Sequence, residues 1–158
     1  MTSVQNTKNT VPQKSVIIES LDQEGRGIAH AESSSPDAGR AHAVQLWIAL
    51  PDHERQREPA FQHCPQLPVV AAGGFEVTVL VGQALGESAP PIVYSPLVGM
   101  DLAASGAAQL RVPVDPGFEF AALCLSGAAV VAGEALLPGT LLYLGSAREF
   151  IEVHCDGA

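Results

Sequence analysis

The pattern of hydrophobic and polar positions is most informative in residues 42–62, where an apolar run is followed by a proline and a charged run. Residues 44–50, VQLWIAL, place Val44, Leu46, Ile48 and Leu50 at every second position. Because side chains alternate across an extended backbone, this pattern predicts a strand. Both of its faces are mostly apolar, so we expect the strand to be covered on both sides, with Trp47 in the core.

Proline and charge end this strand. Pro51 has no N–H for the next ladder bond, and the polar run DHERQRE that follows predicts a turn or short helix. Phe61 then follows Pro59. We expect the stretch as a whole to bridge two layers of the fold.

The rest of the chain predicts short strands separated by turns that contain Gly or Pro. The predicted strands are residues 15–20, 28–32, 75–81, 92–94, 100–104, 109–114, 118–125, 128–132, 141–144 and 149–154. The predicted tail, turns and connectors include residues 1–13, 22–27, 33–40, 63–74 and 82–91. No segment sustains a helical apolar pattern, so the sequence predicts an all-β sandwich or barrel.

Composition narrows the class of protein. The chain has 158 residues and is 47% hydrophobic, which suits a single domain with a real core. Its net charge of −9 disfavours nucleic acid as a partner, because phosphate binding needs Lys and Arg. The polar amino terminus and the short apolar runs predict no signal peptide and no membrane contact, and we place the protein in the cytoplasm. There Cys64, Cys124 and Cys155, which lack short spacings, are expected to be reduced.

Residues 45–62 resemble the pirin family, whose chains carry a QLW-aliphatic-aliphatic-LP segment, a charged bend and a Glu-Pro-x-aromatic-Gln. The matching positions are Gln45, Leu46, Trp47, Leu50, Pro51, Glu58, Pro59, Phe61 and Gln62. YSPLVGMDL and PGFEFAALCLSGAAVVAGEALLPGTLLYL extend the resemblance, which covers about residues 25–155. It implies a cupin-type β-sandwich or barrel, a double-stranded β-helix, that is incomplete.

The resemblance also implies a division of the chain. Residues 1–24 are an N-terminal tail with an atypical strand. Residues 25–62 are a remnant of the family's N-terminal cupin and the linking strand, and residues 63–158 are its C-terminal cupin-like domain. We therefore expect a truncated family member with exposed strand edges, which favour pairing into a homodimer.

The family holds iron with three His and one Glu, two His coming from a His-x-His segment and the rest from Gly-Ile-x-His-x-Glu. This chain has the second motif, with Gly27, Ile28, His30 and Glu32, but no His-x-His. Residues i and i+2 of a strand point the same way, so His30 and Glu32 could reach one metal. Two ligands are too few for a firm iron site, which usually needs two His and one carboxylate. The competing interpretation is that both are polar residues of an exposed strand.

Other candidate residues are weaker. The C-terminal lobe offers Glu119 and no histidine ahead of its first turn, and Glu119 is expected on the rim. The pairs His63–Cys64 and His154–Cys155 lack the usual zinc spacings. His53 lies in a charge cluster and is expected to be solvated.

Three functional hypotheses follow. The first is a non-catalytic, pirin-like cupin that acts through a protein partner. The second is an oxidoreductase resembling the quercetin 2,3-dioxygenases of the family, with iron at His30 and Glu32. The third is RNA binding, because residues 16–30, VIIESLDQEGRGIAH, also resemble the opening of the small RNA-binding TRAM module.

Overall fold

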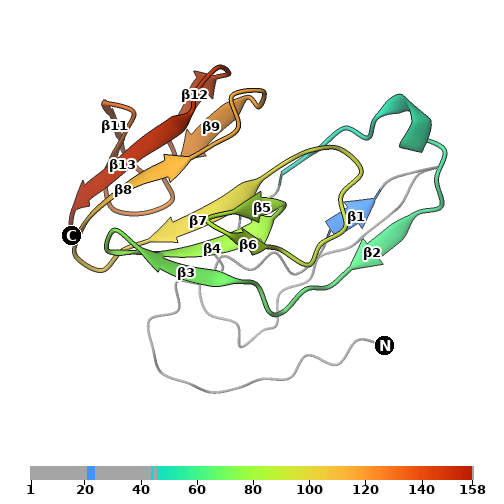
Figure 1. Cartoon of the computed structure of the whole chain (residues 1–158), viewed down its shortest axis with the longest axis horizontal. Coiled ribbons are helices and arrows are strands. Elements are labelled where there is room, and N and C mark those ends of the chain that lie inside the picture. Colours follow the sequence, from blue (N-terminus) through green and yellow to red (C-terminus); the bar gives the residue numbers. More distant parts are fainter. Residues whose placement is uncertain (1–20, 24–43, 45, 158) are drawn as a thin grey trace.

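The computed structural model describes residues 21–23, 44 and 46–157 (Figure 1). Within these ranges the chain is built from antiparallel strands and one short 3₁₀ helix. The elements are β1 (Leu21–Gln23), η1 (Asp52–Glu54), β2 (Ala60–Gln62), β3 (Val69–Ala72), β4 (Phe75–Val81), β5 (Gln83–Ala84), β6 (Glu87–Ser88), β7 (Gly99–Ala103), β8 (Ala107–Pro113), β9 (Phe120–Leu123), β10 (Ala129–Val131), β11 (Glu134–Leu136), β12 (Leu141–Gly145) and β13 (Phe150–Asp156).

β4 is the centre of a three-stranded sheet with the order β3-β4-β7. Its alternating β-branched residues place Val77 and Val79 inside, each 0% exposed. Gly73 and Gly74 form the turn between β3 and β4, and both have positive φ, which glycine adopts without steric cost. The predicted strand at residues 75–81 is therefore confirmed.

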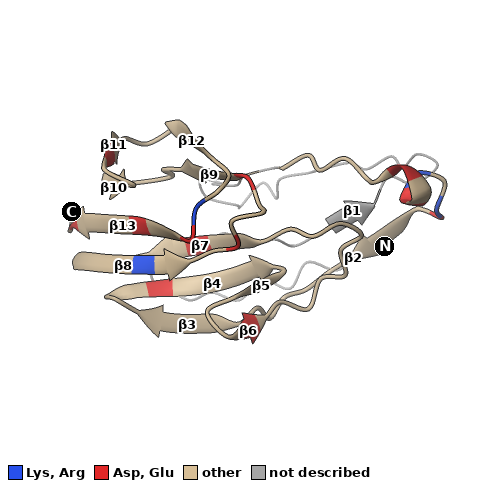
Figure 2. Ribbon diagram, turned by 45° about the horizontal axis from the view of Figure 1, so that its top comes forward, with Lys and Arg blue, Asp and Glu red and all other residues tan. Residues whose placement is uncertain are grey.

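The C-terminal part forms a sandwich of two small sheets. One has the order β11-β10-β13-β8, and the other pairs β12 with β9. β13 and β8 pair over their full lengths, from Phe150 opposite Pro113 to Asp156 opposite Ala107. Figure 2 shows β9 and β12 as a layer apart from β8 and β13. The buried cluster of this part is Cys124, Val131, Leu136, Leu144 and Ile151. This arrangement confirms the predicted all-β, cupin-type sandwich.

A second cluster lies under the three-stranded sheet and is joined to the first. It contains Phe75, Val77 and Ala108. Val153 of β13 packs against both clusters. The backbone N–H of Gln109 in β8 also donates to the carbonyl of Gly73, at 2.8 Å. The β3–β4 turn and the C-terminal sandwich are thus tied together.

The prediction for residues 44–50 is wrong. Residues 46–50 form no strand, and Leu46 and Trp47 are 71% and 79% exposed, so Trp47 is not a core residue. An alternating apolar sequence becomes a buried strand only where neighbours cover it and satisfy its backbone groups. No such neighbour is present among the described residues. The turn or short helix after Pro51 is confirmed as η1.

Other differences concern short elements. The expected connector at residues 63–74 contains β3, the expected loop at residues 82–91 contains β5 and β6, and residues 92–94 form no strand. β1 occupies residues where a turn was expected to begin, and it pairs with β2. The predicted strands at residues 15–20 and 28–32 lie outside the described residues, and the three-part division of the chain stays a prediction. The described part of the chain contains no helix with the length and apolar character that a bilayer-spanning helix needs.

Candidate functional site

The candidate iron ligands His30 and Glu32 lie outside the described residues, so that site stays a prediction. Most of the TRAM-like stretch at residues 16–30 lies outside them as well. Among the residues that are described, no three His, Cys, Asp or Glu side chains are grouped closely enough to hold a metal ion. Cys64, Cys124 and Cys155 are free thiols.

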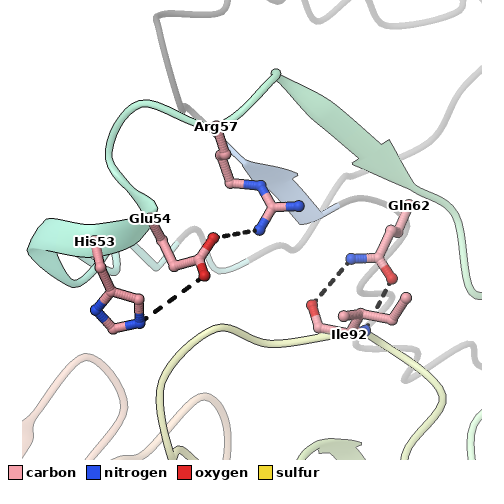
Figure 3. A network of polar contacts seen from close by, with 5 residues as sticks. All are labelled: His53, Glu54, Arg57, Gln62 and Ile92. Atoms are coloured by element: carbon pink, nitrogen blue, oxygen red, sulfur yellow. Dashed lines mark hydrogen bonds and ion pairs between the residues drawn. The ribbon is translucent and has the colours of Figure 1, made fainter.

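The described residues bring together a different polar group, at the contact between residues 52–62 and the loop after β6. Arg57 donates from Nη1 to Oε2 of Glu54 at 3.0 Å. Its guanidinium also lies 3.3 Å from the ring centroid of Tyr94. The Arg57 side chain is 22% exposed, and no described group accepts a hydrogen bond from its Nε. The cation is therefore held between the carboxylate of Glu54, which Figure 3 shows, and the aromatic face of Tyr94.

Gln62 makes a second contact between the same two segments. Its Nε2 donates to the carbonyl of Ile92 at 3.0 Å, and the N–H of Ile92 donates to its Oε1 at 2.8 Å. The side-chain amide thus pairs with a backbone as a neighbouring strand would (Figure 3). Together with Arg57, it fixes residues 52–62, which we call the arm, to the loop at residues 90–95.

The sequence indicated part of this junction. Gln62 and Tyr94 were identified as positions that match the pirin pattern. Arg57 was noted only within a charged bend, although its spacing of three residues from Glu54 is typical of an ion pair on a helical turn. His53 is exposed, as expected, and its Nε2 lies 3.9 Å from Glu54.

Large apolar side chains are exposed in the segment before the arm and, at Phe61, on the arm itself. They are Val44, Leu46, Trp47, Ile48 and Phe61. Two of the acids next to them are ion-paired, Asp52 with Arg55 at 3.1 Å and Glu54 with Arg57 at 3.0 Å. Figure 2 shows acidic and basic segments next to each other at the short helix. Residues 46–50 themselves carry no charge, in a chain of net charge −9.

Glu119 is exposed at the edge of the C-terminal sandwich, as expected for a rim residue. Its negative charge, with a smaller loss of hydration and a hydrogen bond, raises the pKa of Tyr143 on β12 above the ordinary value of 10.0. Tyr143 is itself exposed. Glu119 and Tyr143 belong to the C-terminal part of the chain and are not part of the arm.

Comparison with known proteins places these features in context. A Pseudomonas aeruginosa protein provisionally named a quercetin 2,3-dioxygenase is 46% identical over 132 residues, which cover 84% of this chain and 42% of that protein. Human pirin is 30% identical over 105 residues, covering 65% of this chain and 36% of pirin. A crystal structure of quercetin 2,3-dioxygenase from Acinetobacter baumannii superposes with a TM-score of 0.67 at 42% identity, over 71% of this chain and 38% of that one. No family model matches the sequence. The chain thus spans less than half the length of these relatives.

Proposed function

Since this chain belongs to the pirin family of cupins, we propose that it acts through contacts with another protein, in the cytoplasm, and not by turnover at a metal of its own. The observation that supports this proposal is the run of exposed apolar side chains Leu46, Trp47 and Ile48. Contiguous exposed apolar residues are typical of interaction sites. The arm, which follows this run and carries the exposed Phe61, is held to the loop at residues 90–95 by Arg57 and Gln62.

A metal-dependent dioxygenase is the second candidate. It is favoured by the names of two relatives, which are called quercetin 2,3-dioxygenases. Such a function would need a metal, and iron at His30 and Glu32 is the hypothesis from the sequence. One imidazole and one carboxylate fall short of the two-His-one-carboxylate set of non-haem iron enzymes, so we derive no reaction step through this group.

Metal analysis separates the two candidates. The protein is purified with added ferrous iron, and bound iron is measured together with quercetin consumption. We expect iron below about one-tenth of an atom per chain, because two donors do not hold a metal through purification. The rate of quercetin consumption with the protein should not exceed the rate with the same amount of free iron alone.

A matched pair of variants makes the test specific. His30→Ala removes the candidate ligand, and His53→Ala removes an exposed histidine from the surface. Near-full iron that is lost in His30→Ala and kept in His53→Ala would overturn the proposal in favour of the enzyme.

A further inference from the structure

Residues 46–50, LWIAL, form an apolar segment that belongs to none of the paired strands of the described residues. Leu46, Trp47 and Ile48 are exposed, and no side chain in the segment is charged. Among the described residues, no backbone hydrogen bond joins the segment to a strand. Exposed backbone donors and acceptors on an apolar, β-prone sequence are a template for pairing with another chain.

We propose that this segment pairs with the same segment of a second copy, antiparallel, about a two-fold axis at Ile48. Leu46 of one copy then lies opposite Leu50 of the other, and Ile48 lies opposite itself. Because side chains alternate, these aliphatic residues share one face. On the other face Trp47 lies opposite Ala49, so a large side chain meets a small one. The sequence is therefore complementary to itself in this register.

Charge favours a second copy at this place. Two chains of net charge −9 repel one another over most of their surfaces. Residues 46–50 carry no charge, and the acids that follow, Asp52 and Glu54, are ion-paired with Arg55 and Arg57. Like copies can meet here without placing unpaired acids against each other.

The geometry also limits the assembly. Pro51, which is extended at φ −62° and ψ 153°, has no N–H to continue the ladder. A two-fold pairing uses the same surface on both copies, so it closes as a dimer and does not propagate. This inference rests on the contact function proposed above and names its partner, although its test does not depend on metal binding.

Light scattering at increasing protein concentration tests the dimer. We expect the wild-type chain to form a dimer and Ile48→Lys to remain a monomer, because the variant places two cations opposite each other on the axis. Leu137→Lys, an equally drastic change at an exposed leucine of the C-terminal part, should still dimerise. A wild-type monomer, or loss of the dimer in both variants, would overturn the proposal. Circular dichroism confirms that each variant is folded.

Disulfide trapping tests the register. In a background with Cys64→Ser and Cys155→Ser, Ile48→Cys should cross-link two copies, because directly opposed residues lie about 5 Å apart between Cα atoms, within disulfide range. Leu46→Cys should not, because its copies are four residues out of register, about 13 Å apart. Equal trapping at both positions would refute the axis at Ile48.

Hydrogen exchange tests whether residues 46–50 are covered by a second copy or by the chain itself. In the dimer, the amides of residues 46–50 should become protected as concentration rises. Protection that is already complete in a monomer would mean that the chain covers this segment itself, and the proposal would then be wrong. Iron occupancy does not enter either result, so failure of the dimer and failure of the proposed function are distinguishable.

Discussion

The Arg57 guanidinium makes two contacts of different kinds, an ion pair with Glu54 and a stacked contact with the ring of Tyr94. Arg57→Ala removes both. We expect the free energy of opening of residues 52–62 to fall by about 1–2 kcal/mol. Amide hydrogen exchange of the arm measures this opening.

Arg55→Ala is the matched control for that variant. Arg55 makes an ion pair of similar length with Asp52, but both side chains are well exposed, and none of the described aromatic rings lies over the cation. Exposed pairs contribute little, so the loss should stay below about 0.5 kcal/mol. Equal losses in the two variants would mean that the stacking on Tyr94 does not stabilise the arm.

Tyr143 gives a prediction about pH. Its pKa is raised mainly by the charge of Glu119, so the folded chain keeps the phenol proton to higher pH than the unfolded chain does. The associated stability is present below the unfolded value near 10.0 and is lost as pH rises through the folded pKa. Glu119→Gln should lower the pKa of Tyr143 in a spectrophotometric titration, and Glu134→Gln should leave it unchanged. A pKa that moves equally in both variants would contradict this assignment.

At the scale of elements, the end of β11 places two consecutive leucines in different surroundings, one in the core and one in solvent. Leu136, its last residue, is 2% exposed in the C-terminal cluster, and the next residue, Leu137, is 64% exposed. Leu136→Ala should lower the free energy of unfolding by about 2–5 kcal/mol, because it leaves a cavity. Leu137→Ala should change it by less than about 0.5 kcal/mol. Urea unfolding measures both, and similar midpoints for the two variants would contradict the packing described.

The elements also show what the sequence could predict. β4 was predicted residue for residue because its alternation coincides with its burial. β3 was missed because Pro68 and the Gly73–Gly74 pair, which frame it, looked like signs of a connector. The apolar character of residues 44–50 predicted a strand covered on both faces, but it carries no information on whether another strand lies beside it.

The candidate site was harder to predict than the fold. Motif matching identified Gln62 and Tyr94, but the contact of Arg57 with Tyr94 joins residues 37 positions apart and has no local signature. Pairing of Gln62 with the backbone of Ile92 is equally non-local. His30 and Glu32 remain a prediction from the motif alone.

At the scale of the whole molecule, two hydrophobic clusters share β13, which contributes residues to both. Val153 packs on both, and the Gln109 N–H donates to the carbonyl of Gly73 at the turn of the β3–β4 hairpin. Clusters linked by a shared strand and by such a contact should unfold together, in one cooperative transition. The contact at Gly73 is where this coupling can be tested.

Gly73→Ala should strongly weaken the contact between the β3–β4 hairpin and β8. Gly73 has φ +59°, and a Cβ there would lie 2.0 Å from the carbonyl oxygen of Gln109, so the hairpin must move away from β8. The strained φ and the lost hydrogen bond together predict a loss of about 2–5 kcal/mol in the free energy of unfolding. Gly86→Ala has a similar positive φ, +86°, but its Cβ would meet nothing within 4 Å, so it should lose only about 1–2 kcal/mol. Urea unfolding of the two variants isolates the contact with β8 from the cost of the backbone conformation. Equal losses would mean that the hairpin turn does not hold the two clusters together, and the single transition would then have to depend on Val153 and the β8–β13 ladder.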